Sequence, residues 1–173
     1  MSNRGCEGGI VRRAIRPVVL GIALLVTGIG PARADPVKQT VKFCVGLEQV
    51  LSASRERFEP VRGESKDGRG REWRATLRMP TSRDCIVHLG TPPAYSCELY
   101  DGDTQADADA AYRRTVELVR GCVPKAWTLR EQVDGTLRST SGGGGSQPTV
   151  RVVSELARGD AYLVTLWVTP PTQ

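Results

Sequence analysis

The chain has little histidine and few aromatic residues. His88 is its only histidine, and phenylalanine, tryptophan and tyrosine together make up 5% of its 173 residues. A serine or cysteine nucleophile usually needs a nearby histidine as its base, and the sequence lacks the G-x-S-x-G elbow that presents such a serine. We therefore expect no catalytic residues of this class, and we expect His88 to be a surface or edge-strand residue.

Metal-binding motifs are also missing from the sequence. Zinc sites usually contain cysteine pairs about two to four residues apart, whereas the nearest pair here, Cys85 and Cys97, is 12 positions apart. The acidic run that begins at Asp101 resembles a calcium-binding loop, but it has Ala106 where that loop needs glycine and Tyr112 where it needs glutamate. We expect no metal and no cofactor, and we interpret the acidic run as a helix cap.

No apolar run is long enough to cross a membrane. A membrane-spanning helix needs about 20 apolar residues, and the longest run, residues 17–30, has 14. It follows a basic region that contains Arg12, Arg13 and Arg16, and it precedes a small-x-small motif that ends at Ala34. This order is typical of a secretory signal peptide. We expect cleavage near Ala34 and export to the periplasm or the exterior of a bacterial cell.

Alternatives to this export route exist in the same region. Arg12 and Arg13 form a twin arginine, but Arg16 interrupts the apolar stretch that should follow it in a Tat signal, so Sec export is favoured. An uncleaved N-terminal anchor is disfavoured because the apolar run is short. A lipid anchor would need a cysteine directly after the run, and Cys6 lies before it.

The net charge of the whole chain, +5, overstates that of the expected mature protein. Residues 1–34 carry five arginines and one glutamate, so removing them from 24 basic and 19 acidic residues leaves 19 and 18, a net charge of +1. This balance lacks the strongly basic surface with which proteins bind nucleic acids. Residues 35–173 number 139, which suits a single domain with a hydrophobic core.

Four cysteines follow residue 34: Cys44, Cys85, Cys97 and Cys122. An even number of cysteines in a small exported domain indicates two disulfides. Cys85 and Cys97 lie symmetrically around a turn at residues 90–94, so in a regular hairpin they would face each other within bridging distance. This favours Cys85–Cys97 with Cys44–Cys122. The other two pairings stay open, because all four side chains could face the same layer.

The spacing of apolar residues predicts two helices. Asp35 and Pro36 form a helix start, and apolar residues then recur every three or four positions over 36–56. A capping segment that ends at Thr104 begins the second helix, and Pro124 follows its end. The predicted packing face of the first helix consists of Val37, Val41, Cys44, Leu47 and Leu51, with Phe43 and Val50 beside it.

Alternation of apolar and polar residues predicts six strands. Segments 59–71 and 134–147 are polar and glycine-rich, and we expect them to be loops. The last strand is apolar on both faces, so we expect it to be central and covered on both sides. The expected strands are 72–79, 85–89, 95–100, 127–133, 149–156 and 161–168.

The order of the elements predicts an α+β fold. The order α-βββ-α-βββ favours two helices packed on a mainly antiparallel sheet, stabilised by disulfides. The two halves have similar features: each predicted helix carries a cysteine, and a tryptophan lies at the start of the first predicted strand after each helix, at Trp73 and Trp127. A degenerate internal duplication is one interpretation, and a chance similarity is the other.

The most distinctive predicted surface is basic. Arg74 and Arg78 lie on the polar face of the first expected strand, and Arg69 and Arg71 directly precede it. Such a face could contact an acidic protein or an anionic polymer. The plainer interpretation is an ordinary solvated strand face, because Glu72 lies among these arginines.

These features favour an exported, non-enzymatic binding protein of the bacterial envelope or periplasm, of the inhibitor, immunity or assembly-factor type. We expect its partner to be another protein rather than a nucleic acid. A carboxylate-dependent hydrolase acting on envelope polymer is an alternative, and it would use two acids such as Glu72 and Glu98. A small-ligand carrier is a further alternative, and it would need a cavity that dense packing around Trp73, Trp127 and Trp167 would remove.

Overall fold

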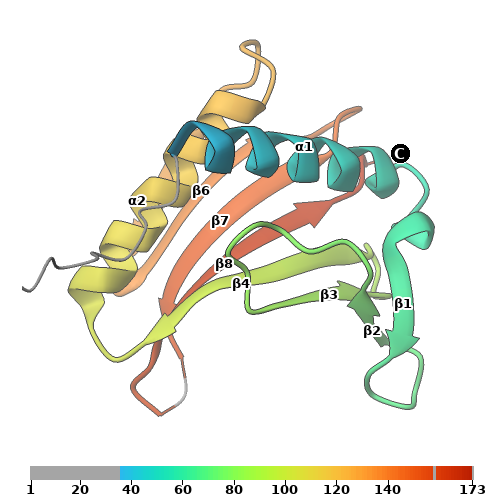
Figure 1. The fold of residues 1–173 in the computed structure, drawn as a ribbon, viewed down its shortest axis with the longest axis horizontal. Helices are drawn as coiled ribbons and strands as arrows, with labels where there is room; N and C mark the ends of the chain where they lie inside the picture. Colours follow the sequence, from blue (N-terminus) through green and yellow to red (C-terminus); the bar gives the residue numbers. More distant parts are fainter. Residues whose placement is uncertain (1–35, 158, 173) are drawn as a thin grey trace, which may run out of the picture. The chain divides into compact units, whose positions relative to one another are not determined.

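The computed structural model describes residues 36–157 and 159–172, which form one compact unit. The predicted signal peptide and its cleavage site near Ala34 lie outside these residues. The elements follow one another as α-ββββ-α-ββββ, with a short 3-10 helix after the first helix, and the strands form one sheet (Figure 1). The α+β class predicted from the sequence is confirmed.

The helices and strands form two similar groups along the chain. The first group consists of α1 (Pro36–Ser54), the 3-10 helix η1 (Glu59–Val61), β1 (Arg62–Ser65), β2 (Glu72–Ala75), β3 (Asp84–His88) and β4 (Ala94–Gly102). The second group consists of α2 (Gln105–Cys122), β5 (Arg130–Asp134), β6 (Leu137–Gly143), β7 (Thr149–Leu156) and β8 (Tyr162–Thr169). Each group is thus a helix followed by four strands.

The sheet is antiparallel, and its strand order is β1-β2-β3-β4-β8-β7-β6-β5. The last strands of the two groups, β4 and β8, pair at the centre, where Tyr95 lies opposite Val168 and Cys97 lies opposite Leu166. The order therefore descends from β4 to β1 on one side of the centre and from β8 to β5 on the other. This arrangement fits an internal duplication, with four strands per unit instead of the three predicted.

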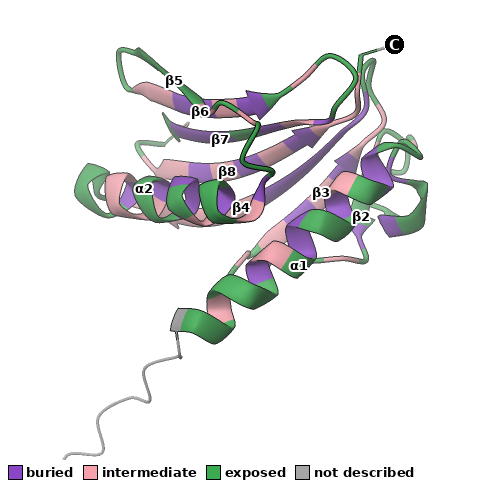
Figure 2. Ribbon diagram, turned by 90° about the horizontal axis from the view of Figure 1, so that it is seen from above, coloured by how far each residue is buried: buried purple, intermediate pink, exposed green. Residues whose placement is uncertain are grey.

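Both helices lie on one face of the sheet (Figures 1 and 2). Apolar residues at three- and four-residue spacing form one stripe along a helix, and the stripe that α1 buries includes Phe43, Leu47 and Val50. Val37 and Val41 are 69% and 58% exposed. Leu47 therefore lies in the packing face as predicted, and Phe43 and Val50, which were expected beside that face, also lie in it. The prediction that Val37 and Val41 belong to the face is wrong.

The second helix begins and ends as its sequence predicts. Thr104 is its N-cap, and the Thr104 hydroxyl accepts a hydrogen bond from the Asp107 N–H at 3.3 Å. At the other end Val123 is extended and donates its N–H to the Val119 carbonyl at 3.0 Å. Pro124 then prevents another helical turn. Within the described ranges, no helix is long and apolar enough to span a membrane.

Strand β8 is central, as predicted, because β4 and β7 pair with its two sides. Val164, Leu166 and Val168 are fully buried in the core under the helices. Leu163 and Trp167 point to the other face and are only half-buried. The prediction of cover on both faces is wrong, since the two helices of the described chain pack on the same side.

Disulfide formation is confirmed. Cys85 and Cys97 are direct cross-strand partners in the β3–β4 hairpin, where both are fully buried and their Cα atoms are 4.2 Å apart. Cys44, inside α1, is bonded to Cys122 at the end of α2, with a Cα–Cα distance of 4.9 Å. One disulfide therefore crosslinks the sheet and the other crosslinks the helix layer.

Two strands lie in segments that the sequence predicts to be loops. β1 lies within 59–71 and β6 lies within 134–147, so the sheet has eight strands and the prediction of six is wrong. Both strands are polar, with sequences RGES and LRSTSGG. They form because a hairpin neighbour supplies backbone hydrogen bonds, which do not require alternating apolar side chains.

Candidate functional site

The sheet face opposite α1 and α2, here called the back face, combines apolar and charged side chains. Side chains alternate along a strand, so the residues buried under the helices determine which of their neighbours point to the back face. On the four central strands these are Asp84, Ile86 and His88 (β3), Ala94, Ser96 and Glu98 (β4), Leu163, Thr165, Trp167 and Thr169 (β8), and Thr149, Arg151, Val153 and Glu155 (β7).

One line of directly opposed residues crosses the back face from β2 to β5. Each residue in it is the cross-strand partner of the next, and neighbouring strands are about 4.8 Å apart, so the line is about 29 Å long. It contains three arginines and a tryptophan, and none of its seven residues is acidic. We call this line the arginine row, and its members in order are Arg74, Ile86, Ser96, Trp167, Arg151, Ser141 and Arg130.

A cluster of ring and polar side chains lies at the centre of the arginine row. The rings of His88 and Trp167 stack with their centroids 5.3 Å apart. His88 Nε2 lies 2.9 Å from the Ser96 hydroxyl, and His88 Nδ1 lies 3.7 Å from a carboxylate oxygen of Glu72. Burial lowers the pKa of His88 below its ordinary value, and this outweighs the opposing effect of Glu72. The imidazole ring is therefore neutral at neutral pH.

Glu72, His88 and Ser96 have the connectivity of an acid–base–nucleophile relay, but their surroundings do not suit catalysis. Ser96 is 7% exposed. Its strand, β4, is paired on both sides, so the backbone N–H groups around it bond to the sheet and are not available to an oxyanion. The arrangement holds the two rings in place and provides no basis for a nucleophilic reaction.

Sequence reasoning missed this cluster because four strands contribute to it. Glu72 is on β2, His88 is on β3, Ser96 is on β4 and Trp167 is on β8. The pairing of β4 with β8 joins the two halves of the chain, and no local pattern in the sequence indicates which strands would be neighbours. The alternation of residues along each strand is the only signal that could have assigned these side chains to a common face.

The four arginines predicted as an interaction face occupy different elements. Arg74 lies on the back face, in the arginine row. Arg69 and Arg71 lie in the β1–β2 loop, where their backbone N–H groups donate to the Asp67 carboxylate at 3.1 and 3.2 Å. Arg78 follows β2, which is shorter than predicted. Only one of the four arginines therefore belongs to the row, and the other half of the chain supplies the rest of its charge.

The two acids named for a hydrolase are far apart on the back face. Glu72 lies beside His88, whereas Glu98 lies beside Asp84. Two strand spacings across the sheet and four residues along it place their Cα atoms about 16 Å apart. Glycoside hydrolases hold their two carboxyl groups about 5 to 9.5 Å apart. The geometry therefore does not favour this pair as a catalytic site.

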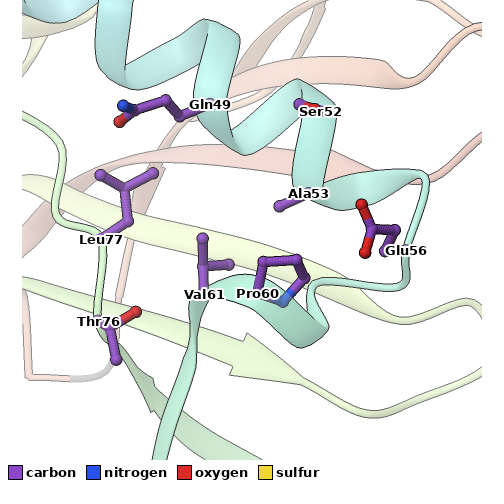
Figure 3. Close-up of a pocket in the computed structure, with 8 residues that line it drawn as sticks. All are labelled: Gln49, Ser52, Ala53, Glu56, Pro60, Val61, Thr76 and Leu77. Atoms are coloured by element: carbon purple, nitrogen blue, oxygen red, sulfur yellow. The ribbon is translucent and has the colours of Figure 1, made fainter.

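On the helix side, an open pocket of about 490 Å³ lies between the end of α1 and the chain around η1 and β2 (Figure 3). Val61 and Leu77 form apolar walls, and the Gln49 amide and the Glu56 carboxylate lie at the rim (Figure 3). Among the described residues, one carboxylate and no cationic side chain line it. In the part of the chain that the structure describes, no group of three or more histidine, cysteine, aspartate or glutamate side chains could hold a metal ion.

The three tryptophans differ in their surroundings. Trp73 and Trp127 are partly buried and pack against the core, whereas Trp167 lies on the back face. Comparison with known proteins adds no assignment to any of these features. No family model matches the sequence, and searches of curated proteins and of solved structures also found no match.

Proposed function

We propose that the mature chain is an exported, non-enzymatic binding protein, and that its back face recognises an acidic surface of another protein. The single observation that carries this proposal is the arginine row, in which Trp167 lies next to Arg151 and in line with Arg74 and Arg130. Tryptophan and arginine are enriched among the residues that dominate protein–protein binding energy. Their alignment on a face that neither helix covers supports a docking role.

The charge of the row is least neutralised on the β5–β8 side. Thr165 and Thr169 flank Trp167 along β8, and Thr149 and Val153 flank Arg151 along β7, so the nearest back-face neighbours are uncharged. On the β2–β4 side, in contrast, Glu72 and Asp84 lie close to Arg74 and offset its charge. The half of the row that contains Arg151 and Arg130 is therefore complementary to an acidic partner.

The scaffold favours binding because it fixes the positions of the row residues before contact. The sheet is continuous over eight strands. The Cys85–Cys97 disulfide crosslinks the sheet, and the Cys44–Cys122 disulfide crosslinks the two helices. A surface held in its bound conformation loses less side-chain and backbone freedom on association. The signal-peptide pattern that ends at Ala34 supports the export part of the proposal, and disulfides such as these persist in the oxidising environment outside the cytoplasm.

The proposal is tested by capture and by charge reversal. Immobilised mature protein is incubated with the exported proteins of the producing bacterium, and each captured protein is identified, purified and titrated against variants. We expect Arg151→Glu and Trp167→Ala to weaken its binding by about 10- to 100-fold. We also expect affinity for the unmodified protein to fall as salt is raised, because exposed charges are screened.

Arg114→Glu is the matched control, since Arg114 is an exposed arginine of α2 on the opposite side of the sheet. It makes the same charge change without altering the back face, and binding should stay within about twofold of that of the unmodified protein. A partner that binds all three variants equally, or that loses affinity only with Arg114→Glu, would contradict the proposal.

A further inference from the structure

A pocket of about 510 Å³ lies at one end of the sheet, where three distant chain segments converge. Residues 54–57 comprise the last residue of α1 and the three that follow it, residues 91–93 lie in the β3–β4 turn, and residues 170–172 follow β8. Its volume is within the range of about 300 to 1,000 Å³ that is typical of small-molecule sites. It is separate from the arginine row and from the pocket in Figure 3.

Four of the nine described residues that line this pocket are prolines. Pro92 and Pro93 line it from the β3–β4 turn, and Pro170 and Pro171 line it from the segment after β8. Proline has no backbone N–H to donate and presents an apolar ring. Four such rings make a surface that can cover an aromatic ring or a short hydrocarbon chain without leaving a donor unpaired.

Charge in the pocket is of one sign. Arg55 and Arg57 line it together with the prolines, two threonines and a serine, and none of the lining residues that the structure describes is acidic. Arg57 is exposed and forms no ion pair within residues 36–157 and 159–172. Arg55 is also exposed, and the only hydrogen bond of its guanidinium group among the described residues is to the uncharged Gln147 amide, at 3.4 Å. Both guanidinium groups can therefore bind an anion.

Hydrogen bonds hold the walls in place without a ligand. The Thr172 N–H donates to the Gly145 carbonyl at 3.0 Å, and the Thr172 hydroxyl donates to the same oxygen at 3.2 Å. Beyond the end of α1, the Phe58 N–H donates to the Ala53 carbonyl at 2.8 Å, and the Arg57 N–H donates to the Ser54 carbonyl at 3.1 Å. The last carbonyls of the helix are thus bonded, and their partial negative charge is not left free to repel an anion.

We propose that this pocket binds a small organic anion with an apolar ring, of the aromatic carboxylate class. The proline rings cover the apolar body of the ligand, and Arg57, with Arg55, pairs with its carboxylate. Arginine suits this role because its planar guanidinium group can donate two parallel hydrogen bonds to one carboxylate. The pocket in Figure 3 lacks this combination, since Glu56 is the one charged side chain among the eight described residues that line it.

The test uses three probes that share one ring system: 2-naphthoate, the neutral 2-naphthamide and the cationic 2-naphthylmethylammonium. Each is titrated into the disulfide-bonded mature protein at low salt, and binding is followed by ligand-observed NMR. We expect 2-naphthoate to bind with a millimolar or lower Kd, about tenfold more tightly than the amide, and we expect no binding of the cation. Arg57→Gln should weaken 2-naphthoate binding by about tenfold, whereas Arg57→Lys should weaken it less.

Two further variants test whether the ligand binds in this pocket: one changes a wall of the pocket, and the other is a control on α2. Pro171→Ser changes an apolar wall and should weaken binding of both the carboxylate and the amide, whereas Arg114→Gln on α2 should change neither. Equal affinity for all three probes, unchanged binding by Arg57→Gln, or no binding of 2-naphthoate up to about 10 mM, the weak end expected for a ligand of this size, would each overturn the proposal. These results do not depend on the back face, so they leave the proposed protein-binding function to its own test.

Discussion

His88 and Trp167 stack on the back face with their ring centroids 5.3 Å apart and their planes inclined by 26°. One ring comes from β3, in the first group of elements, and the other comes from β8, in the second group. Burial lowers the pKa of His88, with a smaller contribution from Lys66, and Glu72 opposes it. Because the two rings touch, the protonation of His88 should be visible in the fluorescence of Trp167.

The depressed pKa predicts how stability changes with pH. The unfolded chain binds a proton at the ordinary histidine pKa of about 6.5, whereas the folded chain binds it only at lower pH. The contribution of His88 is therefore complete above pH 6.5 and is lost as the pH falls through this value toward the folded pKa. Urea unfolding between pH 8 and pH 5 should show a falling free energy of unfolding, and His88→Gln should fall less steeply. Parallel curves for the two proteins would contradict this assignment.

The two disulfides should differ in their effect on stability. Cys44 and Cys122 are 78 residues apart and Cys85 and Cys97 are 12 apart, so the first closes the longer loop in the unfolded chain. Chain entropy predicts a loss of about 4.5 kcal/mol for Cys44→Ser with Cys122→Ser, and of about 2.8 kcal/mol for Cys85→Val with Cys97→Val. Urea unfolding of the two double variants measures this, and the reverse order would show that loop entropy is not the main term.

The turn at the end of β6 depends more on glycine at position 143, the last residue of the strand, than at position 145. Gly143 has a φ of +85°, and a Cβ there would collide with the Pro148 carbonyl and lie 2.8 Å from the Trp127 ring. Gly145 also has a positive φ, +63°, but a Cβ there would have no atom within 4 Å. Gly143→Ala should therefore lower the free energy of unfolding by about 3 kcal/mol or more, against about 1 kcal/mol for Gly145→Ala. Similar losses in the free energy of unfolding for the two variants, measured by urea titration, would argue against the close contacts of Gly143 with Pro148 and Trp127.

A polar cluster between α2 and the edge of the sheet provides another test. The Tyr112 hydroxyl lies 2.6 Å from the Thr140 hydroxyl and 3.2 Å from a Glu131 carboxylate oxygen. Tyr112→Phe leaves the buried Thr140 with one partner fewer, and should cost about 1 to 2 kcal/mol in the free energy of unfolding. Tyr162→Phe is the control, because the Tyr162 hydroxyl has no hydrogen-bond partner among residues 36–157 and 159–172. Equal melting temperatures for the two variants would show that the cluster does not contribute.

Local patterns in the sequence were sufficient to predict much of the fold. Thr104 caps α2 as expected, and the hairpin around residues 90–94 places Cys85 opposite Cys97. The pattern failed where pairing rather than side-chain chemistry creates a strand. β1 and β6 are polar, and β6 ends at Gly143, whose positive φ is not available to most residues. Their partners across the hairpin hold them in the sheet.

The candidate site could be predicted only in part. The alternation of residues along its strand identified Arg74 as part of a polar face. That the arginine row continues from Arg74 through Trp167, Arg151 and Arg130 depends on the order of strands in the sheet. That order is set by long-range packing of β4 on β8, which one sequence does not encode in any local period. The pocket between residues 54–57 and the prolines after β8 is likewise a product of tertiary contacts.

The most direct test of the account is hydroxyl-radical footprinting of the complex with the protein captured in the binding experiment. Trp167 lies on the back face, and Trp127 is a partly buried tryptophan that packs against the core. We predict that complex formation lowers the oxidation rate of Trp167 severalfold and leaves that of Trp127 unchanged. If Trp167 is oxidised equally with and without the partner while residues of α1 or α2 become protected, the back face is not the recognition surface.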